Sequence, residues 1–191
     1  MKTQKLCLVL IVLACVSNTV AAKAPLKRIK LYSPRASGGY DEGKAGFNFK
    51  AGARKEDAKG KWDLGYGFAA INYEDWFVLW SSNETRTVIK DLGAFKWTDK
   101  FQIPVLEPLP KLSKGESRQI VVDASADTGK KWEQTTNIMA KVVVGHLYVL
   151  RVKNDKSDFY ALFRVEELEQ GQHCTITWKR IAAPKQRKSV G

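Results

Sequence analysis

The clearest hydrophobic pattern of the chain lies near its C-terminal end. A row of mostly apolar side chains recurs at every second position in three consecutive runs, at residues 146–153, 158–165 and 174–181. A period of two places alternate side chains on one face, as in a half-buried strand. The segment "NDKS" between the first two runs supplies turn chemistry. The pattern therefore predicts a three-stranded antiparallel meander.

The spacing of these runs also predicts a register. A four-residue loop pairs Lys153 with Asp158, which puts the apolar rows of both strands on the same side. The third strand joins this row when Cys174 lies beside Val165. We therefore expect the row that begins with Cys174 to face the core.

The same register bears on a cysteine–histidine site. His146 and Cys174 would both face inward with one strand between them, roughly 10 Å apart. This distance is too long for a thiol–imidazole hydrogen bond. His173 follows the opposite alternation and points to the other face. The pattern disfavours a nucleophilic Cys174 and predicts a small buried side chain instead.

Further strands are predicted upstream. The segment "WDLGYGFAAI" alternates, and "DWFVLWSS" is apolar on both faces, which is typical of a central strand covered on both sides. We expect "TRTVIKDLG" to be its neighbour, and short strands at residues 29–32 and 47–49. The segments 118–125 and 138–144 are further strand candidates, and "KAGARKEDAKGK" (residues 50–61) reads as a mobile connection.

The segment "FQIPVLEPLPKLSKGES" contains three prolines, which exclude a central strand and predict a surface crossing. No long amphipathic helix pattern is present. The fold class that follows is mainly β: an antiparallel β-sandwich or barrel, a single domain that ends in the three-stranded meander.

The N-terminus has the three parts of a secretory signal: basic residues, the apolar run "LCLVLIVLACV", and small residues up to Ala22. We predict cleavage near Ala22 and a secreted or periplasmic protein. Cys15 in "VLAC" is the candidate for lipidation in an alternative, lipid-anchored form. The predicted divisions are a signal at 1–22, a basic arm and loop at 23–45, a β-rich domain at 46–183 and a basic tail at 184–191.

The net positive charge of the chain limits the classes of binding partner that we expect. The chain has a net charge of +12, and the leader contains two of its 32 basic residues and none of its acidic ones. Such a surplus favours an anionic polysaccharide, a cell-wall polymer or a membrane surface. No nucleic-acid-binding motif is present, so we expect no nucleic-acid partner.

Four residues stand out as candidate binding residues. Trp97 and Trp132 lie in loop-like segments beside lysines, where an exposed aromatic ring suits stacking on a sugar; the alternative is that they cap the ends of the core. Arg54 and Lys55 lie in the basic segment 50–61. Together with the basic arm they form the candidate ligand-binding set.

Other motifs give no catalytic constellation. The run from Asp123 to Gly129 alternates oxygen side chains as calcium loops do, but it lacks the glycine and glutamate that such loops require. Glu166, Glu167 and Glu169 are expected in a solvated turn. If the protein is eukaryotic, the segment "NET" at residues 83–85 is a glycosylation site.

The order of "WDLGY", "DLGAFKW", "YVLRVKNDKSDFYALFRV" and "CTITWK" resembles the HmuY-type haem-binding proteins of bacterial outer membranes. The resemblance implies an exported or lipid-anchored β-rich protein that holds haem between two axial histidines. The chain departs from this family at "NDKSD", where a glycine turn is usual, and at Ala161–Leu162, where a lysine is usual. Neither histidine matches a family ligand by motif.

The sequence thus predicts an exported, non-enzymatic β-domain without a cofactor, whose work is ligand binding or envelope structure. The alternative is a haem- or metal-binding protein that uses His146 and His173, the two histidines of the chain. Both would share a face only if the third strand slipped by one residue. Such a slip would expose Ile176 and Trp178.

Overall fold

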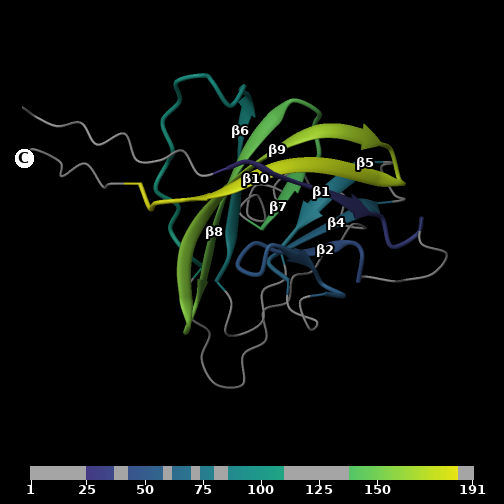
Figure 1. The fold of residues 1–191 in the computed structure, drawn as a ribbon, viewed down its shortest axis with the longest axis horizontal. Coiled ribbons are helices and arrows are strands. Elements are labelled where there is room, and N and C mark those ends of the chain that lie inside the picture. The colour runs from purple at the N-terminus through teal and green to yellow at the C-terminus, as the bar shows by residue number, and fades with distance from the viewer. Residues whose placement is uncertain are drawn as a thin grey trace, which may run out of the picture.

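The protein is built from two antiparallel β-sheets packed face to face, as the computed structural model shows (Figure 1). The structure describes residues 25–36, 43–57, 62–69, 74–79, 86–109 and 138–184. Within these ranges all regular structure is strand and none is helix. The predicted β-sandwich is confirmed, and the two sheets do not close into a barrel.

The first sheet contains the predicted meander. Its five strands follow the order β1-β10-β9-β8-β6, so β1 and β6 form its two edges. The short strand predicted at residues 29–32 is present as β1. The strand bounds are β1 Lys27–Tyr32, β6 Val88–Ala94, β8 His146–Asn154, β9 Ser157–Glu169 and β10 His173–Ile181.

The second sheet is made of shorter strands in the order β3-β2-β4-β5-β7. The predicted strands at 47–49 and 138–144 correspond to β2 and β7. The segment 50–61, expected to be a mobile connection, contributes β3 instead, which pairs with β2. The strand bounds are β2 Gly46–Asn48, β3 Ala53–Arg54, β4 Leu64–Ala69, β5 Glu74–Val78 and β7 Met139–Lys141.

The meander has the predicted hairpin but a different third register. Lys153 pairs with Asp158, as expected. Val165 pairs with Ile176 rather than with Cys174, which lies beside Leu168. The predicted second strand of the meander ends at residue 165, whereas β9 continues to Glu169. A bulge, at the step between Thr175 and Ile176, takes up the extra residue of β9. The shift leaves the apolar row of β10 on the core side.

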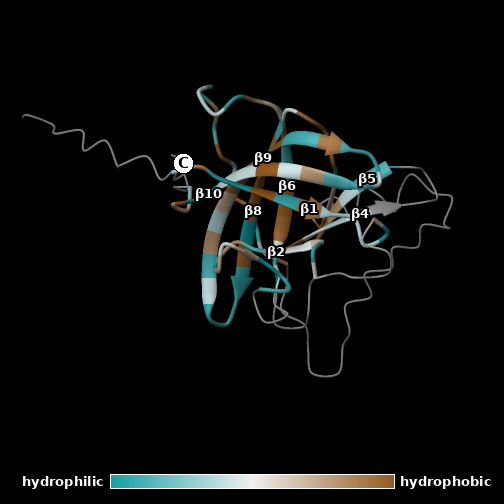
Figure 2. Ribbon diagram, turned by 45° about the vertical axis from the view of Figure 1, so that its right-hand side comes forward, coloured by the Kyte–Doolittle hydropathy of each residue, from teal (hydrophilic) through white to brown (hydrophobic). Residues whose placement is uncertain are grey.

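The space between the sheets is filled by aromatic side chains. The Tyr148 and Phe163 rings stack with centroids 5.1 Å apart, and Phe77 of the second sheet meets Phe163 edge to face at 5.0 Å. Phe47 makes a similar contact with Trp178 at 5.2 Å. Hydrophobic residues follow the middle of the meander, with hydrophilic ones toward the β8–β9 turn (Figure 2). Burial of this area is the main source of stability.

A buried carboxylate joins the two sheets at one end of the core. Asp75 on β5 is 3% exposed and accepts a hydrogen bond of 2.7 Å from the Tyr66 hydroxyl. The backbone N–H of Gly171, in the β9–β10 turn, donates to both Asp75 oxygens at 3.2 Å. Burial and the Asp75 bond raise the pKa of Tyr66. A buried carboxylate with these donors fixes the β9–β10 turn against the second sheet.

The predictions about the central strands are confirmed only in part. β5 lies between β4 and β7, as expected of a central strand. Asp75 and Phe77 on one face of β5 are buried, and Trp76 and Val78 on the other face are partly buried. The segment "TRTVIKDLG" forms β6, which pairs with β8 in the other sheet and not with β5. Sequence alternation alone does not reveal which sheet a strand joins.

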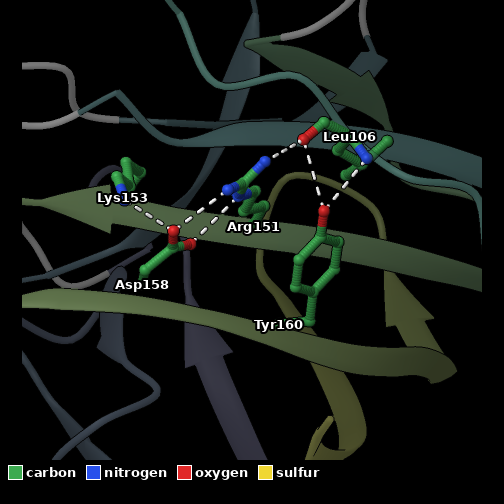
Figure 3. A network of polar contacts seen from close by, with 5 residues as sticks. All are labelled: Leu106, Arg151, Lys153, Asp158 and Tyr160. Carbon is green, nitrogen blue, oxygen red and sulfur yellow. Dashed lines mark hydrogen bonds and ion pairs between the residues drawn. The ribbon is translucent and has the colours of Figure 1, made fainter. Parts of the chain in front are cut away.

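The proline-rich segment packs on the outer face of the first sheet, where a second apolar cluster includes Leu106, Val149 and Leu162. Its anchor is a polar network around Arg151 (Figure 3). Arg151 donates two hydrogen bonds of 3.0 Å to Asp158 and one of 2.7 Å to the Leu106 carbonyl. The predicted surface crossing is thus an ordered covering segment, at least through residue 109.

Candidate functional site

The most distinctive surface of the protein is a basic margin where the edge strands of the two sheets approach each other. We define it by seven side chains on β1 and on the β2–β3 hairpin with its flanks: Lys27, Arg28, Lys30, Lys44, Lys50, Arg54 and Lys55. The Tyr32 backbone N–H donates to the Lys44 carbonyl at 3.2 Å. The Arg54 guanidinium carbon lies 5.9 Å from the Tyr32 ring centroid. These contacts connect β1 to a segment of the other sheet.

Basic residues outnumber acidic ones in this margin, although Arg28 is paired with Glu167 and Arg54 with Glu56. The described segments 25–36 and 43–57 contain eight basic and two acidic residues, a surplus of six positive charges. The whole chain has a net charge of +12, so half of it resides in these two segments. Lys27, Arg28, Lys44 and Lys50 are exposed. A concentrated surplus of this kind creates a positive potential that attracts anions.

Local structure holds the hairpin of the margin in place. Asp63, only 7% exposed, accepts a hydrogen bond of 2.9 Å from the Phe49 backbone N–H. Burial raises the pKa of Asp63 to about 6, although bonds from the backbone at Phe49 and Lys50 oppose the rise. Gly52 completes the turn with a φ of 69°, a conformation that favours glycine. The turn that presents Lys50 is therefore tied to the core.

A tryptophan fixes the other side of the hairpin. The side chain of Trp62 lies over two paired glycines, Gly46 on β2 and Gly65 on β4. A methyl group added at Gly65 would come within 2.7 Å of the Trp62 ring, and one added at Gly46 would come within 3.0 Å of both Trp62 and Lys55. A side chain at either position would force the indole to shift, because the indole approaches the backbone closely.

The outer face of β1 and β10 continues the margin with paired charges. Arg28 forms an ion pair with Glu167, which also accepts a hydrogen bond of 3.0 Å from Thr175. The Arg28 side chain, aided by Thr175, lowers the pKa of Glu167. Lys30 adds a smaller electrostatic contribution in the same direction. The charged form of the Glu167 carboxylate is therefore stabilised beside β1.

The sequence suggested that the three glutamates lie in a solvated turn, but the structure places them in a strand. Glu166, Glu167 and Glu169 all lie on β9, and the turn begins after them. Glu166 pairs with Arg164 and accepts a hydrogen bond from Thr177. Glu169 lies 3.3 Å from His173. Each carboxylate has a basic partner among the described residues.

Trp97 lies on the same outer face and is only partly exposed. Its indole N–H donates to the Thr177 hydroxyl at 2.9 Å, and the Lys179 ammonium lies 4.9 Å from the ring centroid. Thr177 pairs with Arg28 of β1. Trp97 thus caps the second apolar cluster, one strand away from the basic margin. Of the candidate binding residues that the structure describes, Arg54 and Lys55 belong to the margin itself.

The two histidines are not brought together. His146 lies 2.9 Å from Asp91 on β6, and its neighbour Leu147 pairs with Arg164 of β9. His173 pairs with Glu169, at least four residues further along β9, which is about 13 Å at the rise of a strand. The strand β9 also separates them laterally. Two axial ligands must converge on one iron atom, and this arrangement does not fit such a pair.

Cys174 is fully buried in the core between the sheets, as predicted. It is a free thiol, and burial raises its pKa well above the ordinary value. A thiol without solvent access and with a raised pKa is a poor nucleophile. In the described part of the chain, no group of three or more His, Cys, Asp or Glu side chains is arranged to hold a metal ion.

Several predictions fall outside the described residues. They concern the leader with Cys15, the segment at 83–85, the strand candidate at 118–125, the loop from Asp123, and Trp132. Sequence reasoning missed two contributors to the site. Nothing in the sequence places the Lys44 carbonyl beside Tyr32. Asp63 carries a weak signal, because it is a single acid between Trp62 and an alternating apolar run.

Comparisons with known proteins assign the chain to no family. No protein-family model matches the chain, and the searches of curated proteins and of solved structures found no match either. The resemblance to the HmuY-type proteins therefore stays a prediction from the sequence. Among the described residues no helix has the length and apolar character needed to span a membrane.

Proposed function

We propose that this protein is an exported, non-enzymatic binding module that recognises anionic polymers through the basic margin. The observation that carries the proposal is the meeting of two basic segments, β1 and the β2–β3 hairpin, that are not contiguous in the sequence. The partner is a polymer rather than a small anion because the charges extend along a strand and a hairpin. Acidic polysaccharides and acidic polypeptides both have the required chemistry.

The rigidity of the margin supports this proposal. The Asp63 carboxylate and the Trp62 ring hold the hairpin, and the pairing with β10 holds β1. Side chains presented by ordered strands lose less conformational freedom on binding than side chains on a loose tail. The fixed spacing of the charges also favours an extended anionic chain over a diffuse counterion cloud.

Retention on a sulfated polysaccharide column, eluted with a salt gradient, tests the proposal. We expect Lys44→Glu and Lys50→Glu each to elute at clearly lower salt than the wild type, because exposed charges interact through screened electrostatics. The matched control is Lys90→Glu, which makes the same charge change at an exposed residue on β6, the opposite edge of the sheet. Equal shifts for all three variants would show that only net charge matters and would contradict a localised site.

A further inference from the structure

The side of β1 that faces away from β10 is the part of the margin whose backbone groups can still form hydrogen bonds. Among the described strands, β1 lies at the edge of its sheet and has β10 as its one neighbour there. The Tyr32 N–H points away from β10, because it donates to the Lys44 carbonyl, whereas the Ser33 N–H donates toward β10, to the Gln172 carbonyl. Backbone groups of an antiparallel strand alternate between its two sides. The N–H and C=O groups of Arg28 and Lys30 therefore share the outward direction of Tyr32.

These outward groups have no backbone hydrogen-bond partner among the described residues. The hydrogen bond to Lys44 covers this edge at Tyr32. An open row of donors and acceptors is a template for an additional strand. Many peptide-binding domains use such an edge, with main-chain bonds supplying affinity and alternate side chains supplying specificity.

The charges of β1 decide what kind of strand fits. Lys27, Arg28 and Lys30 are three basic residues within four positions. A second copy of β1 would place like charges opposite each other, which is destabilising in a strand pair. A strand with alternating acidic residues would instead place carboxylates beside Arg28 and Lys30 on the outer face. Glu167, held beside Arg28 with a lowered pKa, is an internal example of a carboxylate in that environment.

We infer that the open edge of β1 binds an extended acidic polypeptide segment by strand addition, with backbone hydrogen bonds at Arg28 and Lys30 and ion pairs to their side chains. This inference rests on the proposed function, because the same basic margin supplies the charge. It adds a ligand class and a binding mode, since a polysaccharide offers no regular ladder of amide groups to this edge.

Two variants of one residue separate strand addition from simple charge attraction. Lys30→Ala removes the charge and keeps the backbone N–H. Lys30→Pro removes both, and proline is tolerated where the N–H of an edge strand faces outward. The probe is a short fluorescent peptide in which glutamate alternates with threonine, titrated by anisotropy. We expect Lys30→Pro to bind at least about tenfold more weakly than Lys30→Ala, which corresponds to a lost hydrogen bond and its geometry.

A modified peptide tests the same step on the unaltered protein, in case the proline variant fails to fold. N-methylation of two adjacent central residues removes one donor from each edge of the peptide and keeps its charge. We expect this peptide to bind at least about tenfold more weakly than its parent. Equal binding of the two peptides, or of the two Lys30 variants, would overturn strand addition and leave electrostatic binding intact. Retention on the polysaccharide column without any binding of the acidic peptide would also overturn it, whereas loss of both would overturn the proposed function as well.

Discussion

The guanidinium carbon of Arg54, on an edge strand of one sheet, lies 5.9 Å from the centre of the Tyr32 ring, on an edge strand of the other. This cation–π contact connects the two basic segments. The Tyr32 ring also lies 5.9 Å from the His173 ring, so β3 and β10 each supply one neighbour to this ring.

Removal of the Tyr32 ring tests this connection. We expect Tyr32→Leu to lower the free energy of unfolding by about 1 kcal/mol, because the contact with Arg54 is lost. Tyr32→Phe keeps the ring and should remain close to the wild type. Urea denaturation of both variants measures the difference. Equal losses for Leu and Phe would show that the ring–guanidinium contact contributes nothing.

The glycines beneath Trp62 give a second prediction. We expect Gly65→Ala to lower the free energy of unfolding by about 1–3 kcal/mol, because the new methyl group would lie 2.7 Å from the Trp62 ring and force it aside. Gly67→Ala is the matched control, since no atom lies within 4 Å of the added group and β4 is extended there. Thermal or urea unfolding of the two variants measures the difference. Similar free energies of unfolding for both variants would contradict the close packing of Trp62.

The raised pKa of Asp63 predicts a specific pH dependence. Its folded value of about 6 exceeds its ordinary value of 3.8, so the folded state binds the proton more tightly. The resulting stabilisation is fully present below pH 3.8 and is lost as the pH rises through about 6. Asp63→Asn removes this titration. We expect the variant to gain on the order of 2 kcal/mol relative to the wild type between pH 4 and pH 7.

Urea unfolding of both proteins at these two pH values provides the measurement. The comparison uses the change with pH and not the absolute stability, because an amide cannot reproduce both backbone hydrogen bonds of the carboxylate. A constant difference between Asp63→Asn and the wild type across this range would mean that the carboxyl group titrates normally in the folded protein.

The positions of the histidines predict the response to hemin. Because β9 separates His146 from His173 and they lie at different levels of the sheet, we expect no saturating low-spin absorption band that depends on both. Absorption titrations of the wild type, His146→Ala and His173→Ala test this. A sharp band that disappears in both variants would support the haem-binding alternative and require a rearrangement of the meander.

The sequence was a sound guide where one side of a strand is apolar and the turn is short. The pairing of Lys153 with Asp158 followed from turn chemistry and a shared apolar row. The predicted register of the third strand was wrong because the end of β9 is polar. Glu166, Glu167 and Glu169 resemble a turn in sequence, but basic and hydroxyl partners from β10 and β1 keep them in the sheet.

The candidate site was predictable only in its parts. The basic arm and the pair Arg54 and Lys55 stood out by composition. Their proximity depends on long-range contacts, such as the hydrogen bond from Tyr32 to Lys44, that no local pattern encodes. Trp97 was identified as an aromatic residue beside lysines, yet only the fold shows that its indole N–H bonds to Thr177 across the outer face.

The most direct test of the central claim is a map of backbone amide shifts during titration of the labelled protein with a sulfated oligosaccharide. The proposed function predicts progressive, saturable shifts concentrated in residues 27–32 and 44–55, with little change along β6 around Lys90. Shifts spread evenly over all basic residues, or centred on another face of the sandwich, would contradict a binding site at the basic margin.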